Sequence, residues 1–138
     1  MFLRSIVIVQ MTLAEEQIAN RMKELLSSVP TYSPSHFCYA KIYPKGTSLG
    51  YRTKGWMSAH TFFDAHIEKE IGYVLYIQRD KEIQGRGIGR AMYLAIEQLF
   101  REQGCTRVEL TPSGSGKKGI WESLGFMPKG DGTLCKQL

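Results

Sequence analysis

The strongest periodic pattern of hydrophobic residues in this chain lies between residues 88 and 100. Its members recur at the i, i+3, i+4 and i+7 spacing that places side chains on one face of an α-helix. They are Ile88, Ala91, Met92, Ala95, Ile96, Leu99 and Phe100. We expect this face to be buried in the core. We expect Gly104 to end the helix, because glycine readily adopts the left-handed conformation found at helix C-termini.

Other segments carry weaker but readable patterns. Residues 12–29 predict a helix, since Thr12 and Glu15 have the spacing of a capping box and Pro30 follows the last apolar position. Runs rich in β-branched and aromatic residues predict strands at 2–9, 36–43, 54–63, 71–78, 106–111 and 133–138. The remaining segments are interpreted as a turn or loop at 44–50, a polar connection at 64–70 and a short helix at 117–126.

The order of these elements predicts the fold class. An antiparallel set of strands comes first, and strands then alternate with helices, which is typical of a mixed α/β (α+β) fold. We therefore expect one domain over residues 1–138, with a mixed antiparallel and parallel central sheet flanked by helices. The length of 138 residues suffices for one hydrophobic core. No apolar run approaches the roughly 20 residues of a membrane span, so we expect no membrane partner.

Composition narrows the class of protein only slightly. The three cysteines, Cys38, Cys105 and Cys135, form no C-x-x-C pair, which argues against a disulfide framework or a zinc site and favours a reducing cytoplasm. We expect no metal site. The net charge of +5 suits an anionic ligand without identifying it.

Residues 84–90 read QGRGIGR, with three glycines between a strand and the periodic helix. Backbone N–H groups at such a junction, helped by the helix dipole, form a cradle for a pyrophosphate. A dinucleotide fold is unlike this chain, because Arg90 stands where the third glycine belongs and the segment lies at mid-chain. The later SGSGKKG fails as a P-loop, because Lys118 stands where Ser or Thr is required.

The segment QGRGIG resembles the Q/R-x-x-G-x-G/A signature of the GNAT superfamily of N-acetyltransferases, with Gln84, Gly87 and Gly89 in the defining positions. The order of elements and the ending WESLGF at 121–126 are also similar to that family. The resemblance implies acetyl-CoA as acetyl donor, with its pyrophosphate on the amides of residues 84–90 and its pantetheine arm beside the end of the preceding strand. The implied binding residues are Ile77, Gln78, Arg79, Gln84, Gly85, Arg86, Gly87, Ile88, Gly89 and Arg90.

The chain departs from that family at the residue that protonates the leaving thiolate. Trp121 stands where members often carry tyrosine, and an indole N–H is no useful acid. For the base that deprotonates the acceptor amine, we expect Glu70, at the start of the strand at 71–78, and His60, in the strand before it. Asp64, His66 and Glu68 are further candidates.

Three hypotheses follow for the function. The first is an N-acetyltransferase that moves an acetyl group to a primary amine by direct attack in a ternary complex. The second, suggested by Trp121, is an acyl-CoA-binding module that has lost catalysis, and the third is a basic RNA- or tRNA-associated protein. Aromatic and basic residues dominate segment 30–70, which disfavours polycationic acceptors and leaves open a small amine, a protein amine or an aminoacyl-tRNA. Whether the protein forms a homodimer also stays open.

Overall fold

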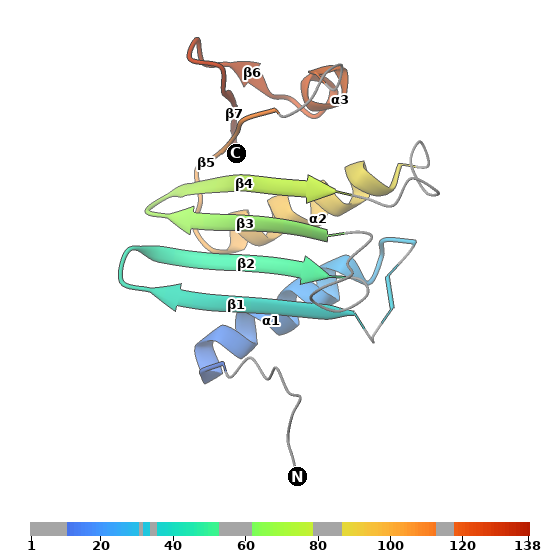
Figure 1. The fold of residues 1–138 in the computed structure, drawn as a ribbon, viewed down its shortest axis with the longest axis vertical. Coiled ribbons are helices and arrows are strands. Elements are labelled where there is room, and N and C mark those ends of the chain that lie inside the picture. Colours follow the sequence, from blue (N-terminus) through green and yellow to red (C-terminus); the bar gives the residue numbers. More distant parts are fainter. Residues whose placement is uncertain (1–10, 31, 34–35, 53–61, 79–86, 113–117) are drawn as a thin grey trace.

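The fold is known from a computed structural model, which describes residues 11–30, 32–33, 36–52, 62–78, 87–112 and 118–138. These residues form three helices and a seven-stranded sheet (Figure 1). The helices are α1 (Leu13–Leu26), α2 (Ile88–Glu102) and α3 (Lys118–Ser123). The strands are β1 (Phe37–Tyr43), β2 (Gly46–Arg52), β3 (Phe62–Glu68), β4 (Ile71–Gln78), β5 (Arg107–Leu110), β6 (Met127–Pro128) and β7 (Leu134–Gln137).

Helix α1 begins with the predicted capping box. The Thr12 hydroxyl accepts a hydrogen bond from the Glu15 N–H at 3.2 Å, and Oε1 of Glu15 accepts one from the Thr12 N–H at 2.8 Å. The second oxygen of Glu15 reaches the sheet, where it accepts a hydrogen bond from the backbone N–H of Ile42 in β1 at 2.7 Å. One buried carboxylate therefore fixes the start of α1 and docks it on the edge strand.

The strand order is β1-β2-β3-β4-β5-β7-β6. All neighbouring strands are antiparallel except β4 and β5, which are parallel and joined through α2. The predicted mixed sheet is thus confirmed. Parallel neighbours need a crossover connection, and the periodic helix supplies it.

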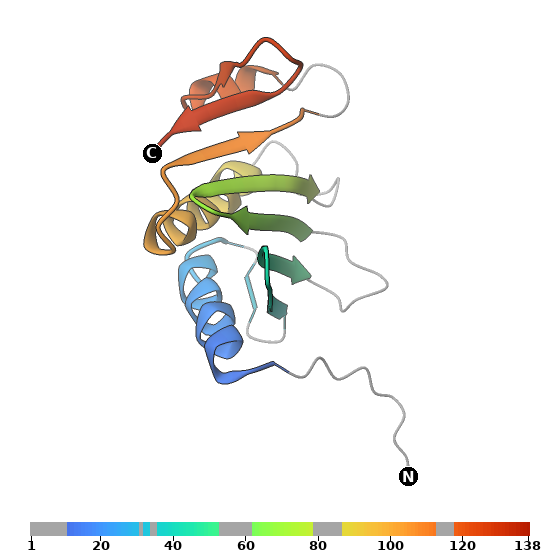
Figure 2. The same cartoon turned by 90° about the vertical axis from the view of Figure 1, so that its left-hand side faces the viewer.

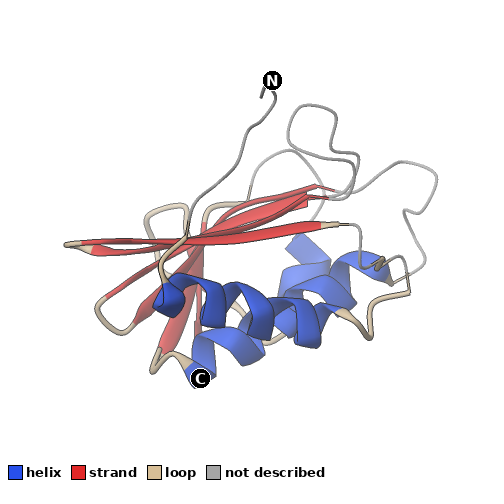
Figure 3. Cartoon of the chain, turned by 90° about the horizontal axis from the view of Figure 1, so that it is seen from below, coloured by secondary structure: helices blue, strands red, loops and turns tan. Residues whose placement is uncertain are grey.

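Helices α1 and α2 cover one face of the sheet (Figures 2 and 3). The predicted stripe of α2 is buried, with Met92, Ile96, Leu99 and Phe100 all at most 1% exposed. Facing strand residues include Val74 and Val108, which alternate with residues that point to the uncovered face. None of the helices in the described part of the chain is long and apolar enough to cross a membrane.

Two predicted elements were wrong. Residues 44–50, expected as a turn or loop, contain the beginning of β2, and residues 64–70, expected as a polar connection, belong mostly to β3. Polar residues are compatible with these strands because none of the helices that the structure describes lies on one of the two sheet faces, so alternate side chains meet water (Figure 3). The predicted strand at 2–9 and most of that at 54–63 lie outside the described residues.

Candidate functional site

One end of the sheet gathers the segments that the resemblance assigned to the ligand. Phe37 pairs with Arg52, Arg52 with Phe62, and Phe62 with Gln78. These four residues therefore lie side by side at one end of the sheet. Ile77 and Gln78 are the last residues of β4 there. The N-terminus of α2 follows after the undescribed segment 79–86, which contains the predicted residues Arg79, Gln84, Gly85 and Arg86.

The start of α2 offers backbone N–H groups without a side-chain cap. Gly87 is the N-cap residue, with φ of 75° and ψ of 8°, and it provides no capping side chain. Its carbonyl accepts the first helical hydrogen bond, from the Ala91 N–H at 3.0 Å. The N–H groups of Ile88, Gly89 and Arg90 precede that bond and have no acceptor within the helix. No acidic residue stands in this first turn, which suits an anion.

Gly87 is required for its backbone angle and not for lack of space around it. The positive φ is strained for any residue with a side chain, yet a Cβ there would meet nothing within 4 Å. Gly104, beyond the other end of α2, has the same properties, with φ of 89° and open space around it. It follows the C-cap residue Gln103, close to the predicted helix end.

Strands β4 and β5 pair over only half of β4. Their pairing runs from Ile71 with Arg107 to Val74 with Leu110, while β4 continues to Gln78. At the same point the register between β3 and β4 shifts, because Asp64 pairs with Tyr76 and Ala65 with Val74. Leu75 is the extra residue of this bulge, and it is 63% exposed. Bulges re-aim side chains and end pairing, often beside functional sites. We call the region beyond the last pair, Val74 with Leu110, where the two strands are no longer paired, the opening between β4 and β5.

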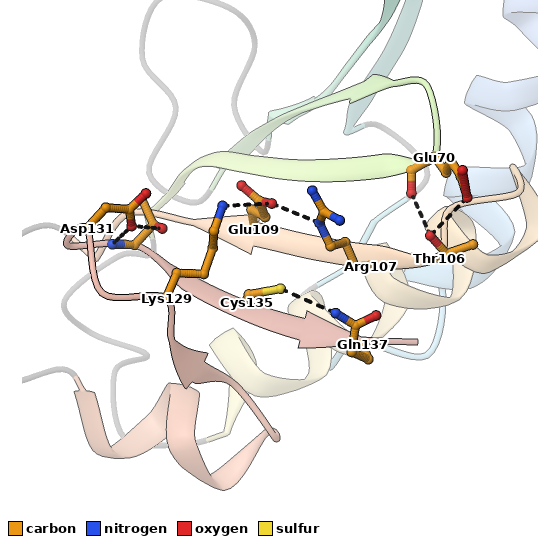
Figure 4. Close-up of polar contacts among 9 residues, drawn as sticks. Glu70, Thr106, Arg107, Glu109, Lys129, Asp131, Cys135 and Gln137 are labelled. Carbon is orange, nitrogen blue, oxygen red and sulfur yellow. Dashed lines mark hydrogen bonds and ion pairs between the residues drawn. The ribbon is translucent and has the colours of Figure 1, made fainter.

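A buried carboxylate lies beside this opening. Glu109 is the penultimate residue of β5 and pairs with Tyr73, on the face opposite α2. Its residue is 8% exposed, and two cations bind its Oε2 oxygen: Arg107 through Nε at 2.8 Å and Lys129 through Nζ at 3.2 Å (Figure 4). Oε1 accepts no hydrogen bond from any residue that the structure describes.

The surroundings of Glu109 act on its pKa in two directions. Burial raises the pKa, but the hydrogen bonds and charges of Lys129 and Arg107 outweigh burial, and the net effect is a lowered pKa. The carboxylate is therefore ionised at neutral pH. With one oxygen bound by cations and the other free, it is able to accept a hydrogen bond from an ammonium group or from water.

Glu70, predicted as the base, lies at the opposite end of β4 from Gln78. It belongs to the turn between β3 and β4, where its carbonyl accepts a hydrogen bond from the Thr106 N–H at 2.8 Å and its Oε1 one from the Thr106 hydroxyl at 3.1 Å (Figure 4). The length of β4 separates it from Gln78, about 25 Å at the usual rise per strand residue. The other predicted base, His60, lies outside the described residues.

The remaining candidates are in β3 and α3. Asp64 and His66 are strand residues, not residues of a connection: Asp64 binds Arg52 at 3.0 Å, and His66 lies 3.3 Å from the Ser48 hydroxyl. The indole of Trp121 packs edge-on against Tyr93 at 5.5 Å and Phe126 at 5.4 Å, and the residue is 9% exposed. Trp121 is therefore a core residue that joins α3 to α2.

Sequence reasoning missed Glu109. The residue sits in a short strand between apolar neighbours, and nothing in the sequence tells which strand it adjoins. The available signal was an acidic residue flanked by Val108 and Leu110, since buried carboxylates in strands are uncommon unless they are paired.

A comparison with models of protein families shows the family of this chain. Residues 14–126 match the model of the Acetyltransferase (GNAT) family. No protein among those with curated descriptions matches the chain by sequence.

Solved structures with a similar fold include two N-acetyltransferases and one putative acetyltransferase. A putative acetyltransferase from Agrobacterium tumefaciens is 17% identical, with a TM-score of 0.54 over 97% of this chain and 99% of its own. The PaiA N-acetyltransferase from Thermoplasma acidophilum, solved with coenzyme A, is 17% identical, with a TM-score of 0.53 over 68% of this chain and 62% of its own. The ribosomal-protein-S18-alanine N-acetyltransferase from Escherichia coli is 19% identical, with a TM-score of 0.53 over 70% of this chain and 71% of its own.

Proposed function

Because this chain belongs to the Acetyltransferase (GNAT) family, we propose that it transfers an acetyl group from acetyl-CoA to a primary amine within a ternary complex. The observation that carries the proposal is the opening between β4 and β5, which lies beside both the uncapped start of α2 and the buried carboxylate of Glu109. A phosphate group and an acceptor amine thus find suitable partners near one place in the fold.

The donor is held mainly by backbone groups. The N–H groups of Ile88, Gly89 and Arg90 donate hydrogen bonds to the pyrophosphate oxygens, and Arg90, exposed in this turn, adds a positive charge. Gln84, Gly85 and Arg86 belong to the same proposed cradle, and Arg79 belongs with the residues proposed to contact the pantetheine arm. Ile77 and Gln78, the last residues of β4, lie beyond the part of the strand that pairs with β5. Their main-chain groups are therefore available to the amide-bearing arm of the donor.

The reaction forms one bond and breaks another. The nitrogen lone pair of the neutral amine attacks the carbonyl carbon of the thioester and forms the C–N bond. The attached nitrogen then loses a proton to water, and the C–S bond breaks with its electron pair leaving on the thiolate. Before the attack, Oε1 of the ionised Glu109 accepts a hydrogen bond from the incoming ammonium group and passes the ammonium proton to water. We propose this role for Glu109 in place of Glu70. The thiolate, with a pKa near 8.5 by analogy with cysteine, leaves without an acid from α3.

Several classes of primary amine are candidates for the acceptor. The neighbours in fold include an enzyme named for a ribosomal-protein alanine, so a protein N-terminus joins small amines and aminoacyl-tRNA among the acceptors to be tested. We place the protein in the cytoplasm, which its free cysteines support. A monomer and a homodimer are both compatible with the proposed site.

The test combines binding with turnover. Calorimetry with acetyl-CoA, NAD and ATP is expected to give binding for acetyl-CoA alone. Thiol release is then followed with acetyl-CoA and tyramine, spermidine, an alanine-initiated peptide and a lysine peptide. Glu109→Gln is expected to lower kcat by about 10²- to 10⁴-fold while it leaves the affinity for acetyl-CoA unchanged.

Each alternative has its own outcome. Binding of acetyl-CoA without acetylation of any amine would favour a module that has lost catalysis. Binding of tRNA without binding of acetyl-CoA would favour a nucleic-acid partner. Full activity of Glu109→Gln would remove Glu109 from the reaction without touching the assignment of the donor.

A further inference from the structure

We propose that Lys129, in the hairpin between β6 and β7, is a positioning residue that keeps Glu109 ionised and correctly oriented for the acceptor amine. The inference rests on the proposed function, since it assigns a role within that same site. It makes a segment 20 residues away from Glu109 a determinant of activity.

The contacts of Glu109 orient its carboxylate. Arg107, two residues earlier in β5, and Lys129 both bind Oε2, at 2.8 Å and 3.2 Å. Because both cations hold the same oxygen, Oε1 is left without a hydrogen-bond donor in the described part of the chain. Figure 4 shows Lys129 reaching Glu109 from one side and Arg107 from the other.

The hairpin is built to hold Lys129 in place. The Lys129 N–H donates to the Thr133 carbonyl at 2.9 Å, and the Thr133 N–H donates to Oδ1 of Asp131 at 3.0 Å. Gly130 and Gly132 have φ angles of 96° and 89°, which let the chain turn sharply. The backbone of Lys129 is thus anchored, and its side chain bridges to Glu109.

The groups that face Glu109 come from several elements. They are Arg107 on β5, Tyr73 opposite it on β4, Cys135 opposite it on β7, and Lys129 with the nearby Asp131 on the hairpin. Among the residues that the structure describes, only Lys129 and Arg107 bring positive charge to Glu109. Without Lys129, only Arg107 lowers the pKa of Glu109 against the effect of burial, which raises it. The carboxyl group therefore takes up a proton at a higher pH than in the native protein.

A second lysine gives a matched control. Nζ of Lys136 in β7 binds Oε1 of Glu97 at 2.7 Å, and Glu97 is as well buried as Glu109. This ion pair joins β7 to α2 on the helix-covered face, away from the opening. Its loss is expected to affect stability alone.

The experiment compares Lys129→Met, Lys129→Arg and Lys136→Met with the native protein from about pH 5 to about pH 9, using the amine from the panel above with the highest kcat/KM. Each variant's kcat/KM is divided by the native value, so that the ionisation of the amine cancels. We expect the ratio for Lys129→Met to stay level at neutral and basic pH and to fall at the acid end of the range, with about tenfold as the upper limit for a pKa rise of one unit. The ratios for Lys129→Arg and Lys136→Met are expected to stay level.

Two further measurements separate this inference from the proposed function. Carbon-13 NMR titration of the Glu109 carboxyl needs no turnover, and it should show a higher pKa in Lys129→Met. In the Glu109→Gln background, Lys129→Met should change nothing more. An unchanged Glu109 pKa, a level ratio for Lys129→Met, or an equal fall in Lys136→Met would each overturn the inference. A native protein that acetylates no amine would instead overturn the proposed function, and the titration would still decide the role of Lys129.

Discussion

Gly72 in β4 and Phe100 in α2 are packed so closely that a Cβ on Gly72 would lie 2.6 Å from Cδ2 of the Phe100 ring. The ring is fully buried, at 0% exposed. Real Cβ atoms do not approach another side chain this closely, so the absence of a side chain at Gly72 lets α2 rest on the strand that it follows in the chain.

Gly72→Ala is therefore expected to destabilise the protein by about 1–3 kcal/mol, the usual cost of overpacking a core. The measurement is the free energy of unfolding in urea. In a Phe100→Leu background the ring is gone, and the same substitution should cost less. Equal costs in both backgrounds would show that the contact with Phe100 is not the cause.

The buried stripe of α2 gives a second prediction. Ile96 is 1% exposed, whereas Leu94, two residues earlier, is 40% exposed. Ile96→Ala should cost about 2–5 kcal/mol because it leaves a cavity in the core. Leu94→Ala, the control on the same helix, should stay within about 0.5 kcal/mol. Similar urea midpoints for the two variants would contradict the orientation of α2.

The glycines at the two ends of α2 allow a test that separates a role in donor binding from the effect of backbone strain. Gly87 and Gly104 both have positive φ and open space for a Cβ. Alanine at either position should cost about 1–2 kcal/mol of stability from the left-handed conformation. Only Gly87→Ala should also weaken acetyl-CoA binding, about tenfold in Kd if about 1.4 kcal/mol is lost. Calorimetry decides, and an equal loss of affinity in Gly104→Ala would contradict a cradle at the start of α2.

The three thiols should differ in reactivity. Burial raises the pKa of Cys38 to about 12 and that of Cys105 to about 11, and both are nearly inaccessible. Cys135 is only partly buried. Because the thiolate is the reactive form, a disulfide reagent at about pH 8 should label one thiol in the folded protein and three after denaturation. Cys135→Ser should abolish the fast reaction, and labelling of Cys38 at the same rate would contradict its burial.

Helices α1 and α2 are also joined by an ion pair that depends on pH. Arg21 donates to both carboxylate oxygens of Glu102, at 2.8 and 2.7 Å, and these hydrogen bonds lower the pKa of Glu102 to about 2. A lowered carboxyl pKa contributes stability above the unfolded value of 4.5, and this contribution is lost as the pH falls toward 2.

Glu102→Gln should therefore be less stable than the native protein above about pH 4.5, and the difference should vanish near pH 2. The effect is modest because both side chains meet solvent. Urea midpoints across this pH range provide the measurement. Glu122→Gln is the control, since Glu122 is exposed and its side chain has no ion pair among the described residues. A difference that persists at pH 2 would point to lost packing instead.

The sequence carried enough information for most of the architecture because periodicity and capping are local. The stripe of α2 and the capping box of Thr12 both depend on residues within a few positions of one another, and both are confirmed. The polar composition of β2 and β3, by contrast, predicted loops where the structure has strands. Residues on the uncovered face of a sheet follow solvent exposure, which depends on where the helices lie.

The candidate site was harder to predict because it depends on pairing between distant segments. The register of β4 with β5 places Glu109 beside the opening, and it places Glu70 at the far turn. Nothing in the sequence near Glu109 indicates that Lys129 reaches it from 20 residues away. The glycine-rich signature, by contrast, is local, and its position at the start of α2 followed directly from the sequence.

The second oxygen of Glu15 has a consequence for the behaviour of the protein at high concentration. Among the described strands, β1 is the last one on its side of the sheet, and unpaired N–H groups on such an edge are templates for pairing with another molecule. Glu15 occupies the N–H of Ile42 with a buried negative charge while it also starts α1. Fraying of the first turn of α1 therefore uncovers part of the edge strand, and resistance to aggregation is coupled to the stability of a helix end.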